Sequence, residues 1–175
     1  DGPVLFSALG NISSARRSGA ELKASIRLEK LRLRNALLSV RYKYQRSAVQ
    51  DPFTGARRRL ATDAGNDYDV VFRHDLTQVA ASYGFSYKEL GDELVTSDLP
   101  VLTTLEIKPT LEVFAEKKLQ HGLALRVEVH NIGGAQHIQN RTLYAVNAID
   151  GTVLRRDYYD EQRSTRYTLR LRGRF

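Results

Sequence analysis

Hydrophobic and polar residues alternate along most of the chain. In residues 36–45, for example, every second residue from Leu38 to Tyr44 is apolar, and the residues between them are polar. Period two is typical of a β-strand, because successive side chains point to opposite faces of a sheet. The pattern predicts an all-β protein with strands at residues 19–29, 36–46, 68–76, 79–88, 103–116, 123–131 and 165–175.

This alternation fits two kinds of all-β protein. A soluble sandwich or barrel packs its apolar face inward and exposes the polar face to water. A transmembrane barrel turns the apolar face to lipid and the polar face to its lumen. Several expected strands are longer than the usual soluble strand of about 5–6 residues. They match instead the roughly 9–11 residues of a tilted transmembrane strand, which favours the second kind.

Short and long connections alternate between these strands. The long ones are polar and rich in Gly, Asp, Asn or Arg, as in outer-membrane barrels, which have short periplasmic turns and long external loops. The short connections are 30–35, 77–78 and 117–122, and the long ones are 47–67, 89–102 and 132–165. We therefore expect an antiparallel up-and-down transmembrane β-barrel. An α-helix over residues 20–33 is the local alternative, because Leu22, Ile26 and Leu33 lie near helical spacing.

The expected strand count predicts an incomplete barrel. If the short connections are periplasmic, the first and last strands both descend, so they cannot pair with each other in antiparallel fashion. Bacterial single-chain barrels have an even number of strands, and an open edge in lipid costs several kcal/mol per unsatisfied group. We expect residues 1–175 to be the C-terminal section, about seven or eight strands, of a larger barrel domain. Residues 4–9 could form the eighth strand, and the absence of a Met at position 1 fits a piece of a longer chain.

Composition and motifs narrow the function. The 175 residues include no Cys, which excludes disulfides and thiolate sites, and no apolar run approaches a transmembrane helix. No HExxH, GxSxG, Walker A or GxGxxG motif occurs. The four histidines show no ligand spacing with carboxylates: His74, His121, His130 and His137. We therefore expect neither an enzyme nor a metal or other cofactor.

Several segments together resemble TonB-dependent outer-membrane receptors. The stretch 167–175 is similar to an outer-membrane assembly signal, with alternate apolar residues and a terminal Phe175. Asn11 followed by residues 19–22 resembles a conserved strand of that family, and residues 51–55 before an arginine run resemble one of its external loops. Residues 129–133 resemble the end of its penultimate strand, although Ile and Gly replace the usual residues.

The resemblance implies a function in energy-coupled uptake of a siderophore, vitamin or oligosaccharide at the bacterial cell outer membrane. It implies a barrel of about twenty-two strands around an N-terminal plug, which lies outside this sequence. The implied partners are the plug and the remaining barrel strands, outer-membrane lipid and lipopolysaccharide, the barrel-assembly machinery, and the TonB complex acting through the plug. Nucleic acid is not among them.

Candidate functional residues follow from this interpretation. The expected assembly signal, which an assembly machine would recognise by adding a strand to an edge, consists of Tyr167, Leu169, Leu171, Gly173 and Phe175. The expected aromatic girdle at the headgroup level consists of Tyr42, Tyr44, Tyr83, Phe85, Tyr87 and Tyr167. The charges expected to face the lumen are Glu21, Lys23, Arg27, Arg41, Lys43, Glu106, Lys108, Glu112, Glu116, Arg126, Glu128, Arg170, Arg172 and Arg174.

Two arginine runs lie in expected long loops. Residues 57–59 and 155–156 could meet lipopolysaccharide phosphates or an anionic ligand, because Arg binds phosphate in a bidentate manner. Simple solvated loop charge is the plainer explanation. The Asp150-Gly151 pair predicts a hairpin in the last loop.

Two other functional classes stay open. One is a small self-contained outer-membrane barrel. The other is a soluble basic β-protein that binds an anionic polymer, which the net charge of +7 allows. Aromatic and basic residues fall on opposite faces of the expected strands, whereas a nucleic-acid platform needs them together.

Overall fold

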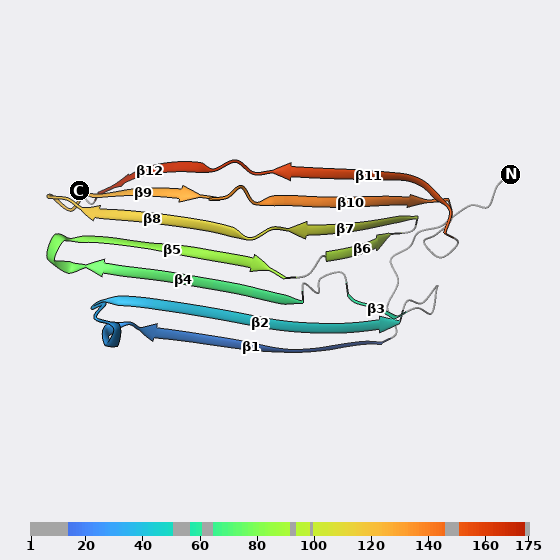
Figure 1. The fold of residues 1–175 in the computed structure, drawn as a ribbon, viewed down its shortest axis with the longest axis horizontal. Coiled ribbons are helices and arrows are strands. Elements are labelled where there is room, and N and C mark those ends of the chain that lie inside the picture. Colours follow the sequence, from blue (N-terminus) through green and yellow to red (C-terminus); the bar gives the residue numbers. More distant parts are fainter. Residues whose placement is uncertain are drawn as a thin grey trace.

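The chain folds into antiparallel β-sheet, as the alternation predicts. The computed structural model describes residues 14–50, 57–60, 65–91, 94–98, 100–145 and 151–173. Within these ranges an eight-stranded sheet has the order β1-β2-β4-β5-β8-β9-β12, with β3 paired to β2, and a four-stranded sheet has the order β11-β10-β7-β6 (Figure 1). The strands are β1 (Ala15–Arg27), β2 (Ala36–Gln50), β3 (Arg57–Arg58), β4 (Asn66–Leu76), β5 (Ala81–Leu90), β6 (Leu94–Asp98), β7 (Val101–Ile107), β8 (Thr110–Lys118), β9 (Ala124–His130), β10 (Gln136–Tyr144), β11 (Val153–Gln162) and β12 (Arg166–Arg172).

The first hairpin excludes the helical alternative for residues 20–33. Strand β1 pairs with β2 without interruption from Ala15 opposite Val49 to Arg27 opposite Leu37. Only a single 3-10 turn, η1 (Glu29–Leu31), follows it. Good helix formers occupy this segment, but its alternating apolar residues gain a continuous partner strand, and such pairing commonly overrides local propensity.

The short connections gather at one end of the eight-stranded sheet. Turn η1, turn η2 (Thr77–Val79) and the bend between β8 and β9 lie at the left in Figure 1, whereas the connections that were expected to be long lie at the right. Residues with positive φ tighten these turns, among them Arg32, Ala80 and His121. The second turn includes Val79, so β5 begins at Ala81 and not at residue 79 as expected.

One expected strand is interrupted, and the expected long loops contain strands. The expected strand 103–116 breaks at Lys108 and Pro109 into β7 and β8, because proline has no N–H to donate to the ladder. The expected loop 132–165 consists mainly of the hairpin β10–β11, and the loop 89–102 contains β6. The prediction of a hairpin in the last loop is confirmed, although Asp150 itself lies outside the described residues.

The interruptions form a line across the molecule. Strand β5 leads into β6, β7 into β8, β9 into β10 and β11 into β12, so the four-stranded sheet extends from one end of the eight-stranded sheet (Figure 1). Asn131, at positive φ, joins the two sheets at this line. Its side-chain amide donates to the Arg163 carbonyl, and its side-chain oxygen accepts from the Ala135 N–H at 2.8 Å.

The eight-stranded sheet is open. Among the described residues, β1 pairs only with β2 and β12 only with β9. Six antiparallel steps separate the two edge strands, so β1 and β12 run in the same direction, as Figure 1 shows. The all-β antiparallel class is therefore confirmed, whereas the described strands form no closed barrel. Residues 4–9, the expected eighth strand, lie outside the described residues.

Candidate functional site

One face of the eight-stranded sheet is apolar over seven strands. The pairing registers bring the apolar alternate positions of neighbouring strands opposite each other, so they form a continuous surface, which we call the apolar face. Its members are Ala20, Leu22, Ala24, Ile26, Leu38, Val40, Tyr42, Tyr44, Tyr68, Val70, Phe72, His74, Tyr83, Phe85, Tyr87, Leu111, Val113, Ala115, Leu125, Val127, Val129, Tyr167, Leu169 and Leu171.

No second layer of the described residues covers this face. Leu22 is 62% exposed, Val127 is 45% exposed and Leu169 is 72% exposed. The buried hydrophobic residues of the described ranges are Ala36, Val49 and Ala135, which together make no core. An uncovered apolar surface of this extent marks an interaction with another protein or with a membrane.

Aromatic residues lie toward both ends of the apolar face. Toward the end of the expected long loops, the Tyr42 hydroxyl donates to Asn66 Oδ1 at 2.9 Å and the Tyr87 hydroxyl donates to Glu89 Oε2 at 2.7 Å. Toward the short turns, the Tyr83 hydroxyl lies 3.0 Å from His74 Nδ1. The rings thus have apolar surroundings while their hydroxyls reach polar partners, an arrangement suited to a membrane interface.

The opposite surface, which we call the polar face, carries nearly all the charge of the eight-stranded sheet. Its ionisable residues are Arg17, Glu21, Lys23, Arg27, Arg41, Lys43, Asp67, Asp69, Arg73, Asp75, Lys88, Glu112, Glu116, Lys118, Arg126, Glu128, His130, Arg166, Arg170 and Arg172. Eleven of the fourteen charges expected to face the lumen are among them. Glu106 and Lys108 lie instead in or beside β7 of the four-stranded sheet, and Arg174 lies outside the described residues.

Glu128 holds together two arginines that face each other across neighbouring strands. Arg126 of β9 is directly opposite Arg170 of β12, a placement of like charges that is unfavourable by itself. The Glu128 carboxylate accepts from Arg126 Nε at 2.7 Å and lies 3.3 Å from Arg170 Nη2. Arg126 also reaches Glu116 Oε2 at 3.4 Å, and His130 Nε2 lies 3.7 Å from Glu128. With 10% of its side chain exposed, Glu128 is the most shielded acid of this network, which we call the Glu128 cluster.

A phenylalanine is part of the otherwise polar surface beside the Glu128 cluster. Phe114 of β8 lies opposite Gly84 of β5, and a Cβ on Gly84 would come within 2.8 Å of the ring and 2.0 Å of the Phe72 carbonyl oxygen. The Arg126 guanidinium lies 4.0 Å from the centre of the Phe114 ring, and Arg73 lies on the same ring at 5.7 Å. The ring therefore covers the glycine and supports two cations.

The Glu128 cluster brings charges of both signs together beside a hollow. A hollow of about 370 Å³ adjoins it at the short-turn end, lined in part by Arg73, Asp75, Ser82 and Glu116. Among the described residues no three His, Asp or Glu side chains come together as a metal-binding group. The polar face carries charges of both signs, and several of its arginines pair with carboxylates, among them Arg126 with Glu116 and Glu128.

The residues of the expected assembly signal lie at the end of the chain and on an edge. Tyr167, Leu169 and Leu171 belong to the apolar face of β12, and Tyr167 is 76% exposed. Gly173 follows the strand directly, and Phe175 lies outside the described residues. Because β12 has one hydrogen-bonding edge without a partner in the described part of the chain, the geometry suits strand addition. Recognition by an assembly machine stays a prediction.

The two arginine runs have different surroundings from those expected. Arg57 and Arg58 form β3, which pairs with the last two residues of β2. Arg155 and Arg156 lie within β11 and not in a loop. Arg155 Nε donates to the Asp157 carboxylate at 2.5 Å. This hydrogen bond, with the charge of Asp157, raises the pKa of the Arg155 guanidinium above its ordinary value.

Sequence reasoning did not identify the roles of Phe114, Gly84 and Asn131. A signal for the first two is present in the pattern, because an aromatic residue and a glycine occur at positions of the polar face that are otherwise charged or small. The contact between Phe114 and Gly84 depends on the β5–β8 register, which the alternation of apolar and polar residues does not determine. Asn131 could be noticed only as part of a family-like segment, not as the residue that joins two sheets.

Comparison with known proteins adds no family to these observations. No protein-family model, no curated protein and no solved structure matches this chain. Within the described residues, none of the helical segments has the length and apolar character that a membrane-crossing helix needs.

Proposed function

We propose that this chain forms part of the wall of a transmembrane β-barrel in the bacterial outer membrane, in a receptor that resembles the TonB-dependent family. The observation that carries the proposal is the division of the eight-stranded sheet into two unlike faces. One face is mainly apolar over seven strands and is uncovered, and the opposite face carries most of the charge, part of it in ion pairs. A soluble sheet would bury the apolar face under another layer of protein and leave the polar face open to water. In a barrel wall, lipid covers the apolar face, and water in the lumen hydrates the polar face.

The open edges support a section of a larger barrel. Strands β1 and β12 run in the same direction, so closure between them in antiparallel fashion requires an odd number of further strands. Residues outside the described ranges, or outside this sequence, would supply those strands. The plug would then meet the polar face, and the four-stranded sheet would extend outside the membrane beside the ligand entrance.

The receptor function rests on the polar face and on the resemblance together. A wide lumen tolerates ionic residues of both signs because water or a plug surrounds them, whereas a packed interior requires every charge to be paired. The Glu128 cluster would contribute one wall of that lumen. Energy-coupled uptake of a siderophore, vitamin or oligosaccharide is the function we propose for the whole receptor.

Site-directed fluorescence tests which face meets lipid. The chain contains no Cys, so single cysteines can be labelled without background. In the full-length protein reconstituted in phospholipid vesicles, a fluorophore at Leu22→Cys is expected to be quenched by brominated lipid and protected from iodide. A fluorophore at Lys23→Cys, the next residue of β1, is expected to show the reverse, because its side chain lies on the polar face.

Two results would contradict the barrel wall. Protection of the Leu22 position from both quenchers would mean that protein covers the apolar face. Quenching of both positions by iodide alone would mean that β1 lies in water. A fluorophore at Leu154→Cys in β11, outside the proposed membrane layer, serves as the control that iodide reaches.

A further inference from the structure

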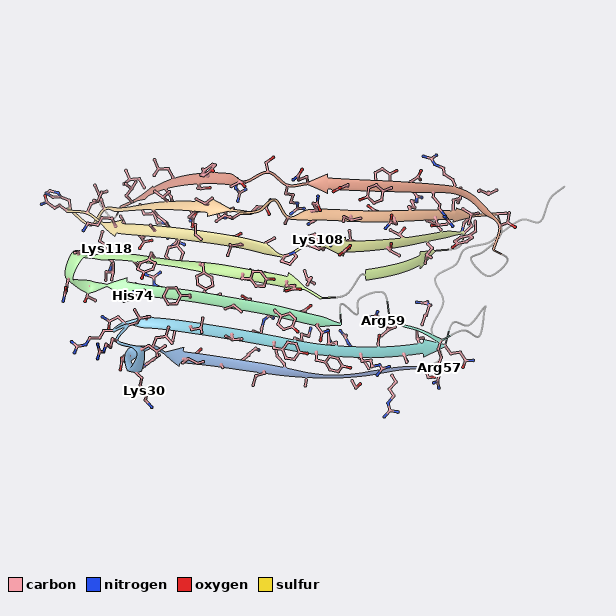
Figure 2. The ribbon with its side chains drawn as sticks, in the orientation of Figure 1. Lys30, Arg57, Arg59, His74, Lys108 and Lys118 are labelled. Atoms are coloured by element: carbon pink, nitrogen blue, oxygen red, sulfur yellow. The ribbon has the colours of Figure 1, made fainter. Side chains whose placement is uncertain are left out.

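Three arginines from three strands continue the apolar face at the end opposite the short turns. Along β2 the residues of this face run from Leu38 to Tyr44, and Arg46 occupies the next position of the same alternation. Arg16 of β1 lies opposite Ala48, and Arg57 of β3 lies opposite Gln50, so both share the face of Arg46. The apolar surface therefore gives way to a basic one, and Figure 2 shows Arg57 at this end of β2.

The three arginines line the same surface hollow. Arg16, Arg46 and Arg57 line one hollow of about 520 Å³ together with Ser18. Arg46 and Arg57 also line a neighbouring hollow of about 530 Å³, which Tyr44 lines as well. We call Arg16, Arg46 and Arg57 the rim arginines.

The rim arginines lack acidic partners in the described part of the chain. No carboxylate among the described residues forms an ion pair with any of the three, whereas Arg41 of the polar face lies 3.9 Å from Glu21 and 3.7 Å from Asp69. Three like charges around one space repel each other unless an anion neutralises them. Planar guanidinium groups match carboxylate and phosphate oxygens in a bidentate manner, and a phosphate group, with a charge of about −1.5 to −2, neutralises more of the three cations than one carboxylate does.

Their position decides which phosphate can reach them. A charge on a lipid-facing surface is costly in hydrocarbon and is tolerated where it reaches the interface. The rim arginines begin directly beyond Tyr44, whose ring is 40% exposed on the same face. They therefore lie at the level of lipid headgroups if the apolar face is in hydrocarbon.

We propose that the rim arginines bind the phosphate groups of the glycolipid that covers the apolar face in the outer leaflet, with lipopolysaccharide as the matching chemistry. This inference rests on the proposed function and deepens it, because it assigns a specific lipid contact to β1, β2 and β3. The acyl chains lie against Leu22 and Tyr42, and the phosphates lie between the three guanidinium groups.

Binding of lipid A, the phosphorylated anchor of lipopolysaccharide, tests the site. The full-length protein in mild detergent is titrated with lipid A and with its dephosphorylated form, and bound lipid is counted by native mass spectrometry. Each basic side chain near an anionic surface contributes enough that Arg16→Gln, Arg46→Gln or Arg57→Gln is expected to weaken lipid A binding about fivefold, and all three together about 100-fold. Affinity for the dephosphorylated lipid is expected to be equal in all variants.

A matched triple variant controls for the loss of net charge. Arg17→Gln, Arg27→Gln and Arg166→Gln remove three arginines of the polar face, and Arg17 is the direct neighbour of Arg16 on the same strand. Their combination is expected to bind lipid A within twofold of the unmodified protein. Heat-modifiable mobility on gels verifies that each protein is folded, and the three single variants carry the test if the triple variant does not fold.

Three results would overturn the site. Equal losses in the rim and control variants would mean that overall charge attracts the lipid. Equal losses for phosphorylated and dephosphorylated lipid would mean that the substitutions act through apolar contact. Displacement of lipid A by inorganic pyrophosphate at the lipid's own concentration would mean that the site takes a soluble anion. If the Leu22→Cys label faces lipid in these experiments, any of these results removes only the rim site and leaves the barrel wall intact.

Discussion

The two sheets of this molecule share their strands' direction but not their chemistry. In the eight-stranded sheet, alternate positions separate into one apolar and one charged face over seven strands. In the four-stranded sheet the same alternation mixes residue types: Leu143 and Arg141 share a face of β10, and Tyr159 and Asp157 share the facing positions of β11. Segregation is needed only where the two faces meet different solvents. Under the proposed function, the eight-stranded sheet lies between lipid and lumen, and the four-stranded sheet extends into water alone.

Both sheets are single layers in the described part of the chain, so exposure alone does not distinguish them. Leu22 in β1 is 62% exposed and Leu154 in β11 is 63% exposed. What distinguishes them is the neighbourhood, since Leu22 lies opposite Tyr42 within an apolar surface, whereas Leu154 precedes two arginines. Equal exposure in unequal surroundings gives a direct way to test the comparison.

The largest effect is expected from placing a charge on each of these two leucines. Leu22→Arg should lower the free energy of unfolding by about 2–3 kcal/mol, because a basic residue costs about 2–4 kcal/mol at the bilayer midplane and less toward the interface, where Leu22 lies opposite Tyr42. Leu154→Arg should change it by less than about 0.5 kcal/mol, as for an exposed position in water. Urea unfolding in phospholipid vesicles measures both. Similar values for the two variants would place both sheets in the same medium.

The next effect concerns the close approach of Phe114 to Gly84 on the polar face. Gly84→Ala should destabilise the folded protein by about 1–3 kcal/mol, because the new methyl group must displace the ring and meets the Phe72 carbonyl. Ser86→Ala, on the same face of β5, is the control and should cost less than about 1 kcal/mol. The same unfolding experiment compares them, and a tolerated alanine at residue 84 would show that the ring does not rest on this glycine.

A comparison of ion pairs sharpens the contrast between shielded and exposed charge. Glu128→Gln leaves Arg126 and Arg170 facing each other, and we expect a loss of about 1–2 kcal/mol. Asp157→Asn breaks the contact with Arg155, whose side chain is 67% exposed, so the expected loss is below about 1 kcal/mol. High salt should reduce the second effect more than the first. Equal losses with equal salt dependence would mean that the Glu128 cluster is no more shielded than the outer pair.

The smallest loss in the free energy of unfolding is expected at the junction of the two sheets, and we expect its effect to be confined to one sheet. Asn131→Ala removes the contacts to Arg163 and Ala135 and should cost about 1 kcal/mol. Hydrogen exchange should accelerate at β10 and β11 while β1 and β2 keep their protection, because the four-stranded sheet depends on this junction. Uniform acceleration in both sheets would mean that they unfold as one unit.

Much of the eight-stranded sheet could be predicted from local pattern. The alternation in residues 36–45 places Arg41 and Tyr42 on opposite faces whatever strand lies beside them, since side-chain direction depends only on position along the strand. The same reasoning placed Glu128 and Arg170 on the polar face. It could not bring them to 3.3 Å, because that distance depends on the β9–β12 register and on rotamers set by neighbours.

The errors of prediction have the same origin. The alternation through residues 103–116 continues across Pro109, so the pattern alone showed one strand where the missing N–H divides it in two. Residues 132–165 were expected to be a long loop with a hairpin at Asp150-Gly151, because they are polar and rich in Gly, Asp, Asn or Arg, yet β10 and β11 pair over nine positions. A strand with water on both faces does not need apolar residues on one face and polar residues on the other. Backbone pairing can therefore form such a strand where the sequence shows no alternation of apolar and polar residues.

The sequence by itself determined which residues share a face, because a period of two is a property of the extended backbone. It thereby determined that one surface of the eight-stranded sheet is mainly apolar and the other mainly ionic. Only the tertiary structure decided which residues of distant segments meet: Phe114 over Gly84 and Glu128 between two arginines. Such contacts depend on strand register and on where strands break, and these are set by hydrogen bonding between segments far apart in the chain, which no local pattern records.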